Sequence, residues 1–158
     1  MEKLDLEFTQ LIEEHKSTIY TVCYMFAKDA EEVNDLFQEA LIHLWKGYNT
    51  YQGKSQVSTW IWKVSFNTCI SWERKKKLPT IPLIEDINLF EDDDKESQQI
   101  RQLHGRIHAL KPFDRAIVLL WLEDLSYKEI GEIVGISEKN VSVRLYRIKE
   151  ELRKMSNN

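Results

Sequence analysis

The sequence predicts an all-α protein with two small helical domains joined by an acidic linker. Apolar residues recur at spacings of three and four along most of the 158 residues, and no stretch shows the alternation of a half-buried strand. Residues 78–97 interrupt this pattern with two prolines and seven acidic residues, and prolines end helices. We therefore expect one domain over residues 1–77, the linker over 78–97 and a second domain over 98–158.

Three helices are expected in the first domain, over about residues 5–27, 29–48 and 57–77. In the first, the polar stretch EEHKST before Ile19 allows a bend or an exposed middle. Residues 49–56 are expected to form a loop that turns at Gly53, and Ser55 near its end can cap the third helix. Apolar residues on two faces of that third helix indicate that it is buried within a bundle.

The second domain is expected to begin with a helix capped by Ser97 and a further helix opened by Pro112, with Leu122 among its inward residues. The stretch that follows predicts a helix-turn-helix motif. Ser126 and Glu129 form a capping box, Gly135 suits a left-handed helix end, and Ser137 can cap the last helix. That helix buries one stripe: Val141, Leu145, Ile148 and Leu152.

The opposite face of the last helix is polar and basic, as in helices that read the major groove of DNA. The alternative is an ordinary helical hairpin with a solvated charged face. The residues that would contact DNA are Lys139, Asn140, Ser142, Val143, Arg144, Tyr146 and Arg147.

One face of the second helix carries an apolar pair among acids, which favours a protein-docking surface. The alternative is that Trp45 packs on the first helix. This face is made of Asp35, Gln38, Glu39, Ile42 and Trp45, with Lys46 beside them.

The third helix carries an aromatic residue beside cations, a combination that suits unstacked DNA because bases stack on rings while cations follow phosphate. The alternative is a core tryptophan and a basic last turn that complements the helix dipole. The stripe consists of Trp60, Lys63, Asn67, Ile70, Arg74 and Lys77.

The formal net charge of −4 is unevenly distributed. Residues 1–52 carry −6, residues 53–77 carry +5, residues 78–100 carry −6 and residues 101–158 carry +3. Two positive blocks can each meet phosphate, whereas the acidic blocks favour a protein partner.

Other function classes find little support. Cys23 and Cys69 are isolated and are expected to be reduced core thiols of a cytoplasmic protein. His104 and His108, four residues apart, are too few for a metal site and are expected at the surface. We find no phosphate-binding loop and no nucleophile with a base, so neither an enzyme nor a cofactor is expected. No signal peptide or membrane-spanning run is present in the sequence.

Three stretches in order resemble the extracytoplasmic-function (ECF) group of bacterial RNA polymerase sigma factors, in the sigma-70 family. DLFQEALIHLWKGY (35–48) is similar to the region 2 helix that binds core polymerase. STWIWKVSFNTCISWERKKK (58–77) is similar to the promoter-melting helix. LKPFDRAIVLLWLEDLSYKEIGEIVGISEKNVSVRLYRIKEEL (110–152) is similar to region 4.

The resemblance implies a protein that binds core RNA polymerase and directs promoter recognition, melting and initiation without catalysis of its own. Asp35, Gln38, Glu39, Ile42 and Trp45 would form a polymerase face, docking on the clamp helices of the largest subunit. Trp60, Lys63, Asn67, Arg74 and Lys77 would form a minus-ten face, with a base held out of the stack near residues 51–58. The DNA-contacting set of the last helix would form a minus-thirty-five face. An anti-sigma protein is an expected partner, by analogy.

The sequence departs from the family pattern at Ser71, Phe66 and the Lys139–Asn140 pair, which concerns the promoter sequence that is read rather than the fold. Two rival interpretations stay open. One is a non-sigma helix-turn-helix regulator, resembling response-regulator outputs, that binds DNA without polymerase. The other is a helical adaptor that binds a protein and no DNA.

Overall fold

The computed structural model describes residues 2–51, 53, 56–76 and 95–156. Over these residues the chain is helical, without strands, and the all-α prediction is confirmed. The helices are α1 (Glu2–Phe26), α2 (Ala30–Tyr51), α3 (Val57–Lys76), α4 (Lys95–His108), α5 (Pro112–Leu122), α6 (Tyr127–Val134) and α7 (Glu138–Ser156).

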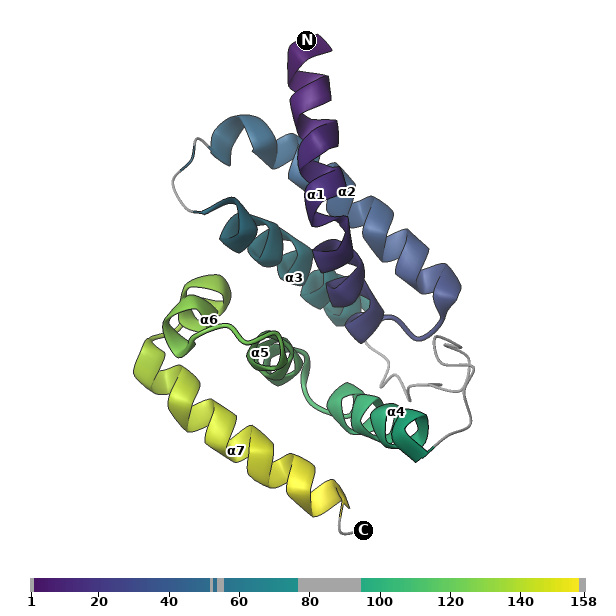
Figure 1. Cartoon of the computed structure of the whole chain (residues 1–158), viewed down its shortest axis with the longest axis vertical. Coiled ribbons are helices and arrows are strands. Elements are labelled where there is room, and N and C mark those ends of the chain that lie inside the picture. Colours follow the sequence, from purple (N-terminus) through teal and green to yellow (C-terminus); the bar gives the residue numbers. More distant parts are fainter. Residues whose placement is uncertain (1, 52, 54–55, 77–94, 157–158) are drawn as a thin grey trace.

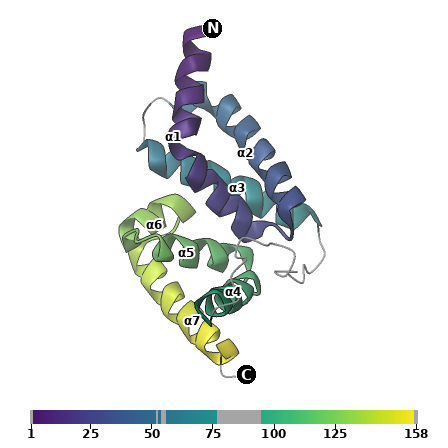
Figure 2. The same ribbon diagram turned by 45° about the vertical axis from the view of Figure 1, so that its right-hand side comes forward.

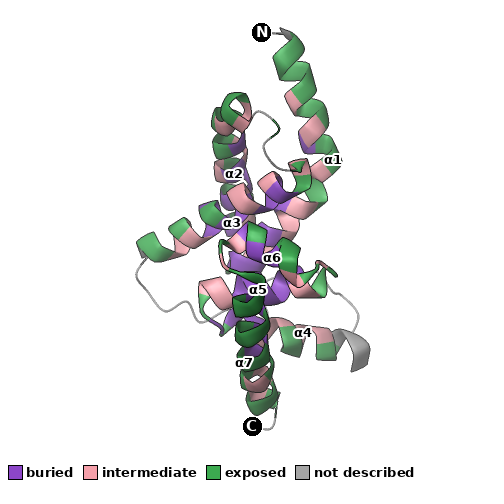
Figure 3. Cartoon of the chain, turned by 90° about the vertical axis from the view of Figure 1, so that its left-hand side faces the viewer, coloured by how far each residue is buried: buried purple, intermediate pink, exposed green. Residues whose placement is uncertain are grey.

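Helix α3 lies at the centre of the molecule. It contacts α1 and α2 on one side and α5 and α6 on the other (Figure 1). This confirms that its two apolar faces are buried. Figures 1 and 2 show α1–α3 forming one bundle and α4–α7 a second one beneath it, with the N-terminal half of α1 projecting beyond both. The two bundles are in direct contact, and Figure 3 shows buried residues gathered where they meet.

The α1–α3 bundle is closed by fully buried aliphatic side chains, among them Ile19, Leu36 and Ile61. Cys23 and Cys69 are unpaired and buried in the same core, as expected. A hydrogen bond with Cys23, together with burial, holds the pKa of the Cys69 thiol well above its usual value. Both cysteines therefore act as small core residues in this structure.

Four sequence expectations need correction or refinement. Helix α1 continues without a break through its exposed middle. Helix α2 runs on to Tyr51, three residues past the expected end. Helix α4 begins at Lys95, so Ser97 lies inside the helix and is not its cap. Leu122, expected inside, is 47% exposed because it lies at the open end of α5. The expected cap at Ser55 lies outside the described residues.

The helix-turn-helix motif forms as predicted. The Ser126 hydroxyl accepts a hydrogen bond from the Glu129 amide, and the Glu129 carboxylate accepts one from the Ser126 amide, both at 3.1 Å. Those bonds hold the pKa of Glu129 below its usual value. Gly135 takes a left-handed φ of 83°, and Ser137 caps α7 by accepting from the Asn140 amide at 3.1 Å.

The turn also depends on a glycine that the sequence pattern did not reveal. A Cβ on Gly131 would lie 2.5 Å from the carbonyl oxygen of Ile136. Such a contact is far inside van der Waals distance, so any side chain at this position would push α6 and α7 apart. Gly131 therefore sets how closely α7 follows the turn.

Candidate nucleic-acid and protein interfaces

The minus-thirty-five face is presented entirely to solvent. Val141, Leu145 and Ile148 are buried against the rest of the α4–α7 bundle, as the stripe predicted, and Leu152 is partly buried. Because these residues turn inward, the opposite side of α7 faces out. The outward residues are Lys139, Asn140, Ser142, Val143, Arg144, Tyr146 and Arg147, and all of them are exposed.

Arg144, on this face, also contacts its own bundle. Its Nη1 lies 3.1 Å from Oδ1 of Asp114, and its guanidinium carbon lies 4.8 Å from the centre of the Phe113 ring. On the other side of α7, the Lys149 amine lies 4.2 Å from the centre of the Trp121 ring. Both contacts join α7 to α5, so the orientation of α7 is fixed by its supporting helix.

The polymerase face on α2 combines exposed acid and exposed apolar surface. Asp35, Gln38 and Ile42 are exposed, and Glu39 is half-buried. Trp45 meets the ring of Phe8 on α1 edge-on, with ring centres 5.0 Å apart, yet remains 42% exposed. The docking interpretation and the packing interpretation are therefore compatible, since α1 supports the indole while leaving part of it accessible.

The minus-ten face is only partly open. Trp60 is half-buried because its ring stacks on Tyr51, with ring centres 4.8 Å apart, and lies 6.4 Å from Tyr48. Lys63 is also half-buried, whereas Asn67 and Arg74 are exposed. Lys77 lies outside the described residues. Trp60 thus belongs to an aromatic cluster built jointly by α2 and α3.

The two tyrosines of this cluster were not identified as site residues from the sequence. Tyr51 was assigned to a turn, at the edge of the stretch 51–58 where the resemblance places a base, and Tyr48 was given no site role. The longer α2 carries Tyr51 onto Trp60, so a base-stacking platform here would include residues of two helices. A local sequence pattern cannot reveal such a cluster, because the stacking partners are nine or more residues apart along the chain.

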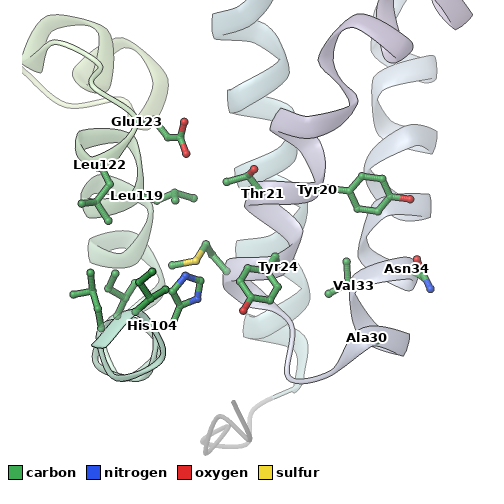
Figure 4. Close-up of a pocket in the computed structure, with 14 residues that line it drawn as sticks. Tyr20, Thr21, Tyr24, Ala30, Val33, Asn34, His104, Leu119, Leu122 and Glu123 are labelled. Carbon is green, nitrogen blue, oxygen red and sulfur yellow. The ribbon is translucent and has the colours of Figure 1, made fainter. Parts of the chain in front are cut away.

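A groove of about 660 Å³ lies between the α1–α2 hairpin and helices α4 and α5. Tyr20, Tyr24 and Val33 line one wall, and Leu103, His104, Leu119 and Leu122 line the other (Figure 4). Glu123 stands at one end of the groove. This surface is apolar and aromatic with few polar groups, which is the composition of binding grooves.

His104 and His108 lie beside this groove, and the expectation that they are surface residues was wrong. His108 is buried and His104 is half-buried, with the His104 ring 5.0 Å from that of Tyr24. Burial, with the nearby charges of Arg115 and His104, lowers the pKa of His108 to about 4. Burial also lowers the pKa of His104.

Neither a metal-type cluster nor a membrane-spanning helix occurs among the described residues. In that part of the chain, no three His, Cys, Asp or Glu side chains come together as metal ligands would. Nor does any helix there have the length and apolar character needed to cross a bilayer.

Comparison with known families identifies the chain. Residues 11–78 match Sigma-70 region 2, and residues 100–152 match Sigma-70 region 4, so the two matches together cover most of the sequence. The first match contains the polymerase face and all of the minus-ten face, and the second contains the minus-thirty-five face. The chain belongs to the sigma-70 family of RNA polymerase sigma factors.

Its relatives place it within the ECF group of that family. It is 27% identical to the ECF RNA polymerase sigma factor SigW of Bacillus subtilis, over 93% of this chain and 87% of SigW. It is 26% identical to the RNA polymerase sigma factor SigV of the same organism, over 86% of this chain and 82% of SigV. It is also 29% identical to the B. subtilis RNA polymerase sigma factor YlaC, over 83% of this chain and 82% of YlaC.

Two solved structures share the fold. One is the sigma factor RpoE in complex with the anti-sigma factor NepR from Bartonella quintana, with a TM-score of 0.74, 16% identity, and coverage of 96% of this chain and 97% of that one. The other is CnrH in complex with the cytosolic domain of CnrY, with a TM-score of 0.70, 16% identity, and coverage of 95% and 87%.

Proposed function

We propose that this protein is an alternative sigma factor whose three surfaces act at successive places on the transcription machinery. It binds core RNA polymerase, directs it to a promoter and helps to open the DNA. The observation that carries this proposal is that the α2 face and the α7 face are both exposed on one chain, each within the matching sigma region. The two-domain division, with residues 1–77, 78–97 and 98–158 as domain, linker and domain, is part of the proposal.

The α2 face suits a protein partner of the opposite charge. Asp35 and Glu39 supply carboxylates, and Ile42 and Trp45 supply apolar surface that water covers poorly. A buried aromatic anchor within a polar rim is the usual composition of a protein–protein contact. The clamp helices of the polymerase would provide the matching basic and apolar groups.

The α3 face suits a strand that has left the duplex. An unpaired base can stack on the Trp60–Tyr51 pair, Asn67 can bond a base edge, and Arg74 can follow the phosphates. The protein makes and breaks no covalent bond in this scheme. Strand opening is favoured only because the protein binds the open strand more tightly than the duplex, so no catalysis is assigned to it.

The α7 face suits the major groove of the minus-thirty-five element. Its N-terminal half carries Lys139 and Asn140, and Arg144 and Arg147 follow one and two turns later. Arginine forms paired hydrogen bonds to guanine and ion pairs with phosphate. The module binds duplex at this face while the α3 face engages the opened strand.

A protein that covers both bundles is the proposed negative regulator. The two solved structures of similar fold are complexes, of RpoE with the anti-sigma factor NepR and of CnrH with the cytosolic domain of CnrY. The apolar groove between α1–α2 and α4–α5 offers a surface for such an anti-sigma protein. The place of action is the cytoplasm, where RNA polymerase is found.

Run-off transcription with purified core polymerase tests the proposal. Core enzyme plus this protein is expected to yield specific transcripts from a subset of genomic fragments. The double variant Arg144→Ala plus Arg147→Ala is expected to lose promoter binding about 100-fold, since each base or phosphate contact contributes about 1–3 kcal/mol. Arg153→Ala plus Lys154→Ala removes the same charge from the end of α7 and serves as the matched control.

The outcomes separate the rival functions. Equal loss in both double variants would mean that only bulk charge matters and that α7 does not read DNA. Strong, specific DNA binding without polymerase would favour the independent helix-turn-helix regulator. Transcription that survives the Arg144/Arg147 change would favour the adaptor that binds protein alone.

A further inference from the structure

A buried arginine connects the two bundles. Arg115, on α5, is 3% exposed, and the two terminal nitrogens of its guanidinium meet the two carboxylate oxygens of Glu73 on α3 end-on. The Nη1–Oε2 distance is 3.0 Å and the Nη2–Oε1 distance is 3.2 Å. The Glu73 side chain is 15% exposed. A paired contact of this kind fixes direction as well as distance, so it holds α3 and α5 in one relative orientation.

The same guanidinium also bonds three backbone carbonyl groups. Nη2 donates to the carbonyl of His108, the last residue of α4, at 2.9 Å, and to that of Leu110, between α4 and α5, at 3.0 Å. Nη1 reaches the carbonyl of Met25, at the end of α1, at 3.5 Å. Arg115 therefore joins the ends of α1 and α3 to the start of α5, and it does so from within the contact between bundles.

Aromatic rings extend this contact along α3. The Arg115 guanidinium lies 4.9 Å from the centre of the Phe26 ring. Phe26 meets Phe66 edge-on at 6.1 Å, and Phe66 stacks on Trp62 at 5.7 Å. Phe26, Phe66 and Trp62 are all buried. Arg115 therefore stands at one end of a row of buried rings that belongs to the α1–α3 bundle.

This closed arrangement cannot occupy a promoter. The minus-ten and minus-thirty-five elements lie about 25 base pairs apart, or about 85 Å at 3.4 Å per pair. In the structure α6 of the helix-turn-helix packs directly on α3, which carries the minus-ten face. The two faces lie on α3, about 30 Å long, and on α7, about 28 Å long, and α6 contacts both helices, so even the far ends of the two faces lie closer together than the two promoter elements.

We propose that the Arg115–Glu73 pair holds the protein in a self-inhibited closed state that must open before both promoter elements are engaged. This inference rests on the function proposed above. The polymerase face on α2 stays exposed when the bundles are closed, so docking on polymerase can precede opening. Opening is then the step that releases α5 and α6 from α3.

An ion pair suits a contact that must form and separate. Burying two charges removes them from water, and their mutual attraction offsets much of that cost. When the bundles separate, both charges regain water, so the closed state is favoured without being permanent. If only the carboxylate is removed, the guanidinium stays buried with one partner fewer, and closure becomes less favourable.

Fluorescence energy transfer between the bundles tests the proposal in the full chain. Dyes are attached at Lys16→Cys on α1 and Glu151→Cys on α7, both exposed, while Cys23 and Cys69 are fully buried and react slowly. Glu73→Gln, which keeps the side-chain size, is expected to raise the ratio of open to closed molecules about tenfold. Glu73→Asp, one methylene shorter, is expected to give a smaller increase.

The control variant is Glu7→Gln, which removes one acid from the exposed N-terminal half of α1. It is expected to leave energy transfer unchanged. Equal energy transfer in Glu73→Gln and the unaltered protein would overturn the proposal, as would an unaltered protein that is already open. Thermal unfolding of each variant shows that any change comes from opening of a folded chain.

The second measurement is promoter-complex formation by polymerase carrying each variant. When the sigma protein is limiting, Glu73→Gln is expected to increase the rate or the extent of promoter-complex formation. Its binding to core polymerase through α2 is expected to be unchanged. A variant that opens without any gain at the promoter would show that closure is not inhibitory. If no variant binds polymerase but Glu73→Gln still opens, the proposed function fails and the contact between bundles stands.

Discussion

Two arginines of the α4–α7 bundle make similar contacts in opposite surroundings. Arg144, on the exposed face of α7, pairs with Asp114 at 3.1 Å and lies over a phenylalanine ring at 4.8 Å. Arg115, the next residue after Asp114, pairs with Glu73 at 3.0 Å and lies over another phenylalanine ring at 4.9 Å. The Arg144 side chain is 47% exposed and that of Arg115 is 3% exposed.

The difference in surroundings decides what each pair can do. An exposed pair contributes about 0–1 kcal/mol because water and salt screen it, so its arginine can exchange a carboxylate for a phosphate at little cost. Removing one member of a buried pair leaves the other charge out of water with less compensation, which costs about 3–5 kcal/mol. The α7 face is therefore suited to binding DNA, and the contact between bundles is suited to holding a conformation.

The largest expected effect is on the buried side of this comparison. Arg115→Ala should lower the free energy of unfolding by about 3–5 kcal/mol, since it removes the guanidinium that pairs with Glu73 and donates to three carbonyl groups. Arg144→Ala should change the same quantity by less than about 1 kcal/mol. Urea denaturation followed by circular dichroism measures both. Similar losses in the two variants would contradict the distinction drawn between the pairs.

The next effect depends on pH and comes from the same buried contact. His108 faces Arg115, His104 and the backbone of Tyr24, and its pKa of about 4 lies below the ordinary value of 6.5. The folded protein therefore binds a proton less readily than the unfolded chain. The stability that results is fully present above pH 6.5 and is lost as the pH falls from 6.5 towards 4, by about 3 kcal/mol in all.

Unfolding measured at several pH values between 7.5 and 5 checks this prediction, in a range where most carboxylates stay ionised. His104 adds a loss of the same sign. His108→Gln should flatten the dependence. A stability that is constant from pH 7.5 to 5 in the unaltered protein would show that these rings are hydrated in solution.

The exposed side of the comparison could be predicted from sequence, and the buried side could not. The α7 stripe, the capping box and the glycine turn are all set by neighbours within four residues, so spacing alone locates them. Arg115 and Glu73 are 42 residues apart, and nothing near Arg115 in the sequence marks it as buried. Its burial depends on how the two bundles meet.

The same reasoning explains the other errors. His104 and His108 were expected at the surface because two histidines four residues apart on a polar helix usually are, yet α4 turns them towards α1. Tyr51 was expected in a turn, yet α2 continues and brings it onto Trp60. In each case a contact between helices determined the role of a residue whose local pattern was ordinary.

The smallest expected effect concerns the exposed pair itself. Asp114→Asn should change the free energy of unfolding by less than about 1 kcal/mol, the sum of a weak surface pair and a small interaction with the α5 dipole. It should raise promoter affinity about two- to fivefold at low salt, because a negative charge is removed near the phosphates and Arg144 is released. The gain in promoter affinity should shrink as salt is added.

Glu123→Gln, which neutralises an exposed acid just past the end of α5, is the control for charge alone. A loss of affinity in Asp114→Asn would instead mean that the carboxylate holds Arg144 in the orientation that DNA requires. The exposed pair would then act, like the buried one, by fixing the position of its arginine.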